Sequence, residues 1–297
     1  MAIADQSRND SDLFAQRLAT RGASLPRAGR RVAHFIDRNR AAALASSAMD
    51  LAASTGTSDA TVIRAAQALG FAGLGDLKQA LVASIANPST PADDMRRTLD
   101  DVGESTSRAV DVVLEAHHEA MQSLRSPASR GQIVAAVAAL HPSERIVVFG
   151  IGPSAPLARY VAVLLGRTGR RSSTLNETGI MLADQLLDLR SGDALLVLAY
   201  GRAYREVVAI FGEARRLRLP VVLVTDSLDS KLARAADVVV PARRGRTERV
   251  ALHGATLVGL EALVLGLAAI DRMRAISALE RLNDLRGVVS GQRQDVG

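Results

Sequence analysis

The segment GIGPS has residue types and a spacing that suit the binding of an anion. Gly150, Gly152 and Ser154 directly follow an apolar run and precede a helical pattern. Glycine lets the backbone approach a ligand closely, the free N–H groups at a helix N-terminus carry partial positive charge, and a serine hydroxyl adds a donor. A phosphate is therefore the expected ligand. The same short motif also occurs where a loop simply connects a strand to the following helix. Ala155 stands where a GxGxxG dinucleotide motif has its third glycine.

A second candidate site lies in Met49 to Gly70, which reads MDLAASTGTSDATVIRAAQALG. The pattern predicts a helix from Ala48 to Thr55 that ends at Gly56, because glycine readily adopts the positive φ that a tight turn needs. Ser58 is the expected N-cap of a second helix, and Asp59 faces the positive end of its dipole. A helix, a turn and a second helix result.

The second helix has an inner and an outer face. Val62, Leu69 and Ala65 or Ala66 form the inner face, and Ala52 allows close approach of the first helix. The outer set is Ser58, Asp59, Thr61, Arg64 and Gln67. In a helix-turn-helix these residues meet bases and phosphates of the major groove, so we expect Arg64 to contact guanine or phosphate, and Thr61 and Gln67 to contact bases or backbone. The alternative is a capped helical hairpin with no DNA role.

Other reactive groups are sparse. The chain has no cysteine, which excludes disulfides and thiolate chemistry, and its five histidines show no metal-ligand spacing. Asn176 and Glu177 follow a predicted strand, where an isomerase would keep its base, but Asn176 as a helix N-cap with Glu177 beside the dipole is the favoured interpretation. We expect neither a metal nor a cofactor.

The elements that position these residues fall into two domains. The chain has 297 residues and a net charge of +6, and all but two of its cations are arginine. The segment 87–94 has the composition of a linker. We expect an all-α domain over 1–86, a second domain over 95–285 and a disordered tail over 286–297.

The second domain alternates apolar runs with helical patterns. A long amphipathic stretch from Met95 to Leu124 and a helix from Ser129 to Leu140 come first. The runs that follow predict strands at Arg145–Gly150, Arg171–Leu175, Ala194–Tyr200, Pro220–Asp226 and Asp237–Pro241. This rhythm is typical of an α/β domain with a doubly wound, five-stranded parallel sheet.

The segment from Leu25 to Leu81 closely resembles the N-terminal domain of the RpiR family of bacterial regulators. The likeness includes LPRAGRRVAHFIDRN, the helix-turn-helix and an LGF-x-G-x-x-DLK segment carried here by Leu69, Gly70, Phe71, Gly73, Asp76, Leu77 and Lys78. The resemblance implies DNA binding and adds Lys78 to the candidate contacts.

The segment from Ser126 to Ile270 resembles the SIS (sugar isomerase) domain that follows in that family. Three blocks carry the likeness, namely GIGPS, ALLVLAYGRAYREV and VTDSLDSKLARAADVVV. The effector-binding residues that the resemblance implies are Gly150, Gly152, Ser154, Asn176, Tyr200, Gly201, Arg202, Tyr204, Thr225, Asp226 and Ser230.

The middle block departs from the family pattern S-x-S-G-x-T, whose hydroxyls hold a phosphate. Ala199, Gly201, Arg202 and Tyr204 stand where Ser, Ser, Gly and Thr are usual. Arg202 or Arg205 would replace the hydroxyls with a charged contact, to which Tyr204 adds a donor. Equally, these are solvated loop residues and the pocket has changed or lost its ligand.

These expectations combine into a transcription regulator whose partners are a double-stranded DNA operator, a small phosphorylated ligand of the sugar-phosphate class and its own copies in a homodimer or tetramer. The apolar helix Ala251–Ile270 is expected to contribute to oligomerisation. His253 and Glu261 interrupt it, and MAIADQSRND lacks the features of a signal peptide, so a cytoplasmic location without a membrane is expected. The alternatives are a sugar-phosphate isomerase or lyase with a helical appendage, and a metabolite-binding protein that no longer binds DNA.

Overall fold

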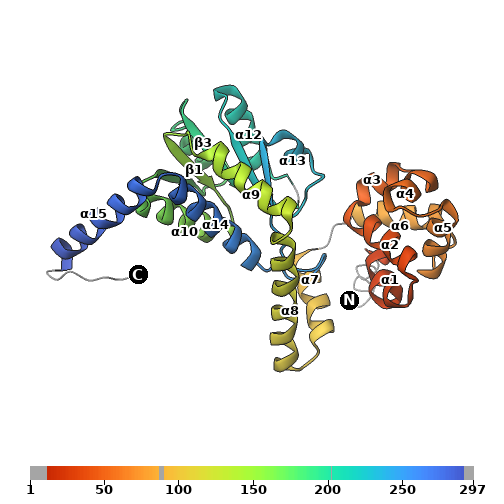
Figure 1. The fold of residues 1–297 in the computed structure, drawn as a ribbon. Coiled ribbons are helices and arrows are strands. Elements are labelled where there is room, and N and C mark those ends of the chain that lie inside the picture. The colour runs from red at the N-terminus through yellow and green to blue at the C-terminus, as the bar shows by residue number, and fades with distance from the viewer. Residues whose placement is uncertain (1–11, 87–89, 202, 291–297) are drawn as a thin grey trace, which may run out of the picture. The chain divides into compact units, whose positions relative to one another are not determined.

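Short helices build the first part of the chain (Figure 1). The computed structural model describes residues 12–86, 90–201 and 203–290, and the chain divides into two units, residues 1–101 and 102–297. The elements of the first unit are α1 (Leu13–Arg21), a 3-10 turn (Gly22–Ser24), α2 (Arg27–Arg38), α3 (Arg40–Ala45), α4 (Ala48–Thr55), α5 (Asp59–Ala68), α6 (Leu74–Ala86) and α7 (Pro91–Val102). The all-α prediction is confirmed for the described residues.

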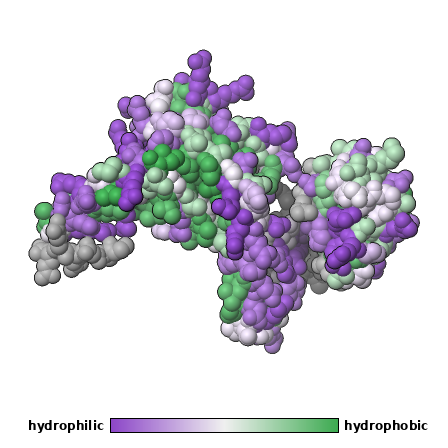
Figure 2. Space-filling model, viewed as in Figure 1, coloured by the Kyte–Doolittle hydropathy of each residue, from purple (hydrophilic) through white to green (hydrophobic). Residues whose placement is uncertain are grey.

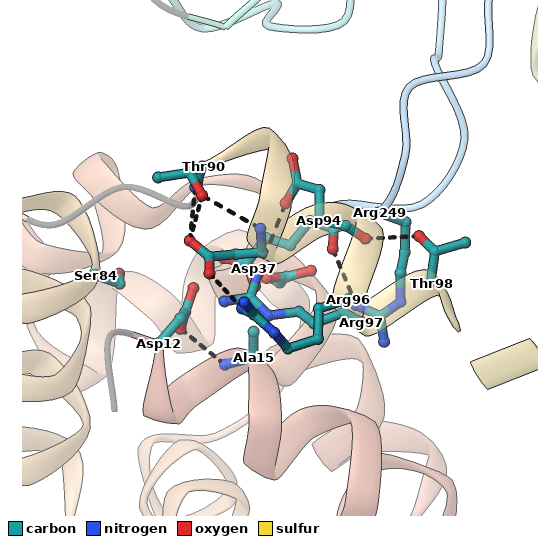
Figure 3. A network of polar contacts seen from close by, with 12 residues as sticks. Asp12, Ala15, Asp37, Ser84, Thr90, Asp94, Arg96, Arg97, Thr98 and Arg249 are labelled. Atoms are coloured by element: carbon teal, nitrogen blue, oxygen red, sulfur yellow. Dashed lines mark hydrogen bonds and ion pairs between the residues drawn. The ribbon is translucent and has the colours of Figure 1, made fainter. Parts of the chain in front are cut away.

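One apolar core joins α1 to α6. Its largest fully buried side chains are Phe14, Ile36, Leu51, Leu69, Leu77 and Leu81. At its edge the buried Asp12 carboxylate accepts the Ala15 N–H at 2.9 Å (Figure 3). The same carboxylate pairs with Arg40, and Arg40 also donates to Asp37 at 2.7 Å. These carboxylates compensate the burial of the Arg40 guanidinium, and the pKa of Arg40 lies above its ordinary value as the net result.

The expected stretch from Met95 to Leu124 is two helices. After α7, Gly103 takes a φ of 65°, and α8 (Thr106–Leu124) begins with Ser105 as its cap, the Ser105 hydroxyl accepting the Arg108 N–H at 3.2 Å. A positive φ cannot continue a helix, which explains the break. The first three residues of the predicted linker, 87–89, lie outside the described residues, and α7 begins at Pro91.

The second unit is built on a five-stranded, all-parallel sheet, as predicted. The strands are β1 (Arg145–Phe149), β2 (Arg171–Leu175), β3 (Asp193–Leu198), β4 (Val221–Thr225) and β5 (Val238–Pro241), in the order β2-β1-β3-β4-β5. The pairs Val147–Ser173 and Val147–Leu195 set the register of the first three strands.

Helices cover both faces of the sheet (Figure 1). Alternate strand residues point to opposite faces, so Ile146 and Val148 pack on one side and Val147 and Phe149 on the other. The first face lies against α9 (Pro127–Leu140), α10 (Ser154–Arg167) and α14 (Gly254–Ile270). The second lies against α11 (Ile180–Leu186), α12 (Arg205–Leu217) and α13 (Lys231–Ala235).

The last two helices differ in burial. One face of α14 packs in the core, and α15 (Arg272–Ser290) has only Ala275 buried within its described length. Helix α15 runs five residues into the segment 286–297 that was predicted as a disordered tail, and residues 291–297 lie outside the described part. No single described helix has both the length and the apolarity of a membrane span; α14 and α15 pass such a test only as a pair bent by 106°.

Candidate DNA-binding and effector sites

The α4–α5 unit has the turn and caps of a helix-turn-helix. Gly56 ends α4 in the left-handed conformation, with φ 60° and ψ 45°. Ser58 caps α5, its hydroxyl accepting the Thr61 N–H at 3.3 Å. At the start of α4 the Ser47 hydroxyl accepts the Asp50 N–H. The Asp50 carboxylate accepts the Ser47 hydroxyl at 2.7 Å and the Ser47 N–H at 2.8 Å, and these two hydrogen bonds lower the pKa of Asp50. The predicted bounds of α4 and the predicted N-cap of α5 are confirmed.

The inner face of α5 is buried as the sequence pattern indicates. Val62, Ala65, Ala66 and Leu69 are each less than 5% exposed, and α5 packs on α2 as well as α4. The small side chain of Ala52 is also buried at the α4–α5 contact. This packing fixes which residues α5 turns outward.

The outward face carries the predicted DNA-binding residues. Asp59, Arg64 and Gln67 are exposed, and the Arg64 Nε donates back to the Ala60 carbonyl at 3.2 Å. Thr61 is half-buried and its hydroxyl lies 2.9 Å from the Ser58 hydroxyl, so both side chains also serve the cap. Their contacts with DNA stay predictions.

Two outward residues were missed from the sequence. Ala60 and Ile63 lie on the same exposed stripe as Arg64 and Gln67, and Ile63 is 40% exposed although it is apolar. The spacing i, i+3, i+4 and i+7 of these four residues was the available signal. Apolar side chains at such positions suit contact with thymine methyl groups.

Lys78 has a contact within its own domain. Its ammonium donates to the Ser46 carbonyl at 2.6 Å, at the end of α3, and the side chain is half-buried. Other residues of the same motif are structural too, since Leu69, Phe71 and Leu77 are buried and the Asp76 carboxylate accepts the Ala72 N–H at 2.9 Å. The role of Lys78 toward DNA stays a prediction.

In the second unit the candidate effector residues follow the carboxyl ends of four parallel strands. All four ends meet at one edge of the sheet. The chain passes from β1 to β2 on one side and then to β3 on the other, so the topological switch point lies between β1 and β3. Ligands of doubly wound domains bind in the crevice at that point. The GIGPS loop and the loop after β3 flank it.

The GIGPS loop depends on the close approach of α10 to β1. A Cβ on Gly150 would lie 2.5 Å from the Ser154 carbonyl oxygen, and Gly152 takes a φ of 56° with open space around it. Ser154 begins α10, and its hydroxyl has no hydrogen-bond partner within the described part of the chain. The loop thus presents a free hydroxyl at a helix N-terminus.

The loop after β3 is short of hydroxyls, as its sequence indicates. Ala199 is buried, Gly201 takes a φ of 64°, and Tyr204 is 56% exposed directly before α12. Arg205 begins α12 and is also exposed. Arg202 lies outside the described residues.

The loop after β2 differs from the sequence interpretation. Gly179, not Asn176, is the N-cap of α11. The Gln185 side-chain Oε1 accepts the Asn176 and Glu177 N–H groups at 3.0 and 3.1 Å, and Gln185 Nε2 donates to Asn176 Oδ1 at 3.2 Å. The Gln185 side chain thus satisfies the backbone N–H groups of this loop and the Asn176 side-chain oxygen. The Glu177 side chain is exposed.

The loop after β4 uses its hydroxyls internally. The Thr225 hydroxyl accepts the Ser227 N–H at 3.1 Å and the Ser230 hydroxyl accepts the Ala233 N–H at 3.0 Å, so they form a turn and the cap of α13. The Asp226 carboxylate accepts the Arg244 Nε–H at 2.9 Å. Effector contacts from Thr225, Asp226 and Ser230 stay predictions.

A cluster around Tyr200 was not foreseen. Its hydroxyl lies 2.7 Å from the Thr256 hydroxyl, and Arg244 covers one ring face with Cζ 4.2 Å from the centroid. The His253 and Tyr200 rings are T-shaped, with their centroids 5.6 Å apart. Burial raises the pKa of Tyr200 to about 12, and burial with the nearby Arg244 charge lowers the pKa of His253. Arg244, His253 and Thr256 follow β5, far from Tyr200 in sequence, and no local pattern marks them.

A metal centre has no basis in the described side chains. Among them no group of three or more His, Asp or Glu residues is placed to hold an ion. The polar groups at the carboxyl edge include hydroxyls, amides, backbone N–H groups, the Asp226 carboxylate, the His253 imidazole and the Arg244 guanidinium.

Family comparisons match both units. The helix-turn-helix domain of the rpiR family matches residues 13–88, and the SIS domain matches residues 139–271.

Solved structures are similar as well. The sugar isomerase domain of an RpiR transcription factor from Sphaerobacter thermophilus is 29% identical, with a TM-score of 0.52, over 59% of this chain and 97% of that one. The Vibrio vulnificus NanR protein complexed with ManNAc-6P is 23% identical, with a TM-score of 0.49, over 92% and 97% of the two chains. A putative sugar-phosphate isomerase from Listeria monocytogenes is 19% identical, with a TM-score of 0.49, over 57% and 94%.

Proposed function

Because the chain belongs to the RpiR family, with that family's helix-turn-helix domain ahead of an SIS domain, we propose that it is a DNA-binding transcription regulator. Its SIS domain binds a small phosphorylated metabolite of the sugar-phosphate class, and the genes it controls serve carbohydrate metabolism. As a regulator of operator DNA it works in the cytoplasm and is not an enzyme.

The observation that carries the proposal is the capped α5 helix with its exposed stripe. Gly56 and Ser58 fix the turn, and the buried inner face leaves Asp59 exposed at the start of the second helix and Arg64 and Gln67 exposed further along it. The Arg31 guanidinium donates to the Gly56 carbonyl at 3.3 Å, which adds a cation beside the turn. A second helix with exposed polar side chains and flanking cations suits the major groove.

The ligand class is supported by the carboxyl edge of the sheet. The GIGPS loop offers a helix N-terminus and the Ser154 hydroxyl at the β1–β3 switch point. The Sphaerobacter thermophilus domain, a sugar isomerase domain that belongs to a transcription factor, supports the use of this fold for sensing.

Self-association is supported by an apolar surface on α10 and α14. The outer face of α14 exposes Val258 and Leu265, the latter at 72%, and α10 beside it exposes Tyr160 and Val163. Figure 2 shows hydrophobic side chains gathered on the side of the second unit where these two helices lie. The Tyr160 hydroxyl donates to Glu261 at 2.9 Å and so ties the two helices together. An apolar patch shared by two helices suits a two-fold interface between copies of the chain, as a homodimer or within a tetramer.

The enzyme alternative required a buried Glu177, and that side chain is exposed. The alternative predicts turnover of a sugar phosphate that Glu177→Gln abolishes. The regulator predicts binding of the same compounds without turnover.

The test is a titration of fluorescent DNA from upstream of its own gene with the full-length protein, read by anisotropy against random DNA of equal length. Specific binding should weaken steeply between about 50 and 200 mM salt. Arg64→Ala should weaken it by about 1–3 kcal/mol, with a salt slope smaller by about 1 if Arg64 meets a phosphate. Arg215→Ala on α12 removes an equally exposed charge from the other unit and should have little effect. Equal affinity for upstream and random DNA would overturn the proposal.

A further inference from the structure

Arg244 lies at the carboxyl edge of the sheet in a fixed orientation. Its guanidinium stacks on the Tyr200 ring at 4.2 Å, and its Nε donates to the Asp226 carboxylate at 2.9 Å. The Asp226 interaction uses the Nε side of the group, and Nη1 and Nη2 have no hydrogen-bond partner among the described residues. The Arg244 side chain is 25% exposed, so this outer fork is open to a ligand.

His253 provides a second unused polar atom beside the same ring. Its Nδ1 is buried and has no hydrogen-bond partner in the described part of the chain. The imidazole forms a T-shaped pair with the Tyr200 ring, and the Tyr200 hydroxyl is already hydrogen-bonded to Thr256. Since buried polar groups are nearly always paired, an unpaired nitrogen here indicates a partner that is not part of this domain.

The loop after β3 lacks the means to hold a phosphate by hydroxyls. Ala199 is buried without a polar side-chain atom, and Tyr204 is largely exposed before α12. Tyr200 belongs to this same loop. Asp226 follows β4, and Arg244 and His253 follow β5, so the cluster around Tyr200 lies at the carboxyl ends of β3, β4 and β5.

We propose that Arg244 is the cationic anchor of the effector site, where its Nη1 and Nη2 fork holds the phosphate of a sugar phosphate and His253 Nδ1 hydrogen-bonds the same ligand. This inference rests on the proposed function of the SIS domain. The planar fork of arginine matches two oxygens of a phosphate, and Asp226 and Tyr200 hold it ready at a smaller entropic cost than a free side chain would bear. Arg244 thus takes the role that the usual hydroxyls have lost.

The test uses the full-length protein, a panel of hexose 6-phosphates and the same hexoses without phosphate, with affinities from calorimetry. Arg244→Gln should weaken the tightest hexose 6-phosphate at least tenfold. Arg243→Gln is the matched control, because Arg243 is its exposed neighbour on the same loop with no side-chain partner among the described residues, and it should change the affinity less than twofold. Arg244→Lys keeps the positive charge but loses the two-pronged guanidinium, so its affinity for the same hexose 6-phosphate should lie between those of Arg244→Gln and Arg243→Gln.

A second readout follows His253 directly. The chain has five histidines, so the imidazole nitrogens can be resolved by NMR and assigned with His253→Gln. Saturation with the tightest sugar phosphate should shift the His253 signals in the native protein and in Arg243→Gln. Unchanged His253 signals on saturation would overturn its part in the site.

The outcomes separate this inference from the function on which it rests. Phosphate-dependent binding that survives Arg244→Gln, but is lost in Arg205→Gln or Arg202→Gln, would overturn the role of Arg244 and leave the sugar-phosphate sensor standing. If the native protein binds no hexose 6-phosphate in the panel more tightly than the free hexose, the ligand class fails and this inference fails with it. Melting curves of each variant check that the domain remains folded.

Discussion

Replacement of Gly150 by alanine should destabilise the SIS domain more than the same replacement two residues later. The new Cβ would lie 2.5 Å from the Ser154 carbonyl oxygen, 2.9 Å from its carbon and 3.0 Å from the Ala158 Cβ. Two of these are backbone atoms that cannot rotate away, so the first turn of α10 must move off β1. Overpacking of this kind costs about 1–3 kcal/mol, and the rigid neighbours favour the upper part of that range.

Gly152→Ala is the matched control in the same loop. Its φ of 56° is unfavourable for alanine, but a Cβ there meets no atom within 4 Å. The left-handed conformation costs roughly 1–2 kcal/mol, and the smaller entropy of the unfolded alanine chain offsets about 0.4–1 kcal/mol of it. We therefore expect a net loss of about 0–1.6 kcal/mol.

Urea unfolding followed by tyrosine fluorescence measures this difference in the correct domain. The chain has no tryptophan, and its three tyrosines, Tyr160, Tyr200 and Tyr204, all lie in the second unit. Gly150→Ala should lower the midpoint more than Gly152→Ala at an unchanged m-value. Equal losses, or a larger loss for Gly152→Ala, would refute the argument that a close approach of α10 to β1 builds the phosphate loop.

Three further outcomes are expected. Ser47→Ala removes the cap of α4 and should cost the helical domain about 0.5–2 kcal/mol by circular dichroism, while Ser47→Thr should cost much less. Asp193→Asn removes the carboxylate charge that accepts two hydrogen bonds from Arg145, at 2.9 and 2.6 Å, and should lower the free energy of unfolding in urea by about 1.5–3 kcal/mol. Asp188→Asn, at the exposed end of the same cluster, should lower it by less than about 1 kcal/mol. Because burial raises the folded pKa of Tyr200 to about 12, the unfolded chain releases this proton first, so stability present below about pH 10 should fall as the pH rises toward 12, with a shallower fall in Tyr200→Phe.

Much of the fold was predictable because local patterns determine it. Runs such as RIVVFG and PVVLVTD are apolar on both faces, which only a covered parallel strand permits, and each predicted strand matches the structure to within a residue or two. The caps and the turn glycine likewise gave the bounds of α4 and the start of α5. The break at Gly103 also had a local signal, a glycine followed by the cap Ser105, which the amphipathic pattern on either side obscured.

The effector site was less accessible from sequence because distant residues complete it. Tyr200 was a candidate from its place after β3, but Arg244, His253 and Thr256 come from the segment after β5 and meet it only when the sheet forms. The hydroxyls of Thr225 and Ser230 have the chemistry of a phosphate site, but in the fold they accept backbone N–H groups in a turn and at the cap of α13. The residue types in the sequence identified the side chains that can donate hydrogen bonds to a ligand. Only the fold shows which of these donors have no partner within the domain.

On the proposed function, binding of a phosphorylated ligand and binding of DNA are coupled within one chain, and the coupling can be measured from both sides. The dissociation constant for the upstream DNA should change about 5- to 150-fold when a saturating sugar phosphate from the panel is present. The dissociation constant for that sugar phosphate should change by the same factor when DNA is present, because binding linkage is reciprocal. A sugar phosphate that binds the SIS domain and leaves the DNA affinity unchanged would contradict the account.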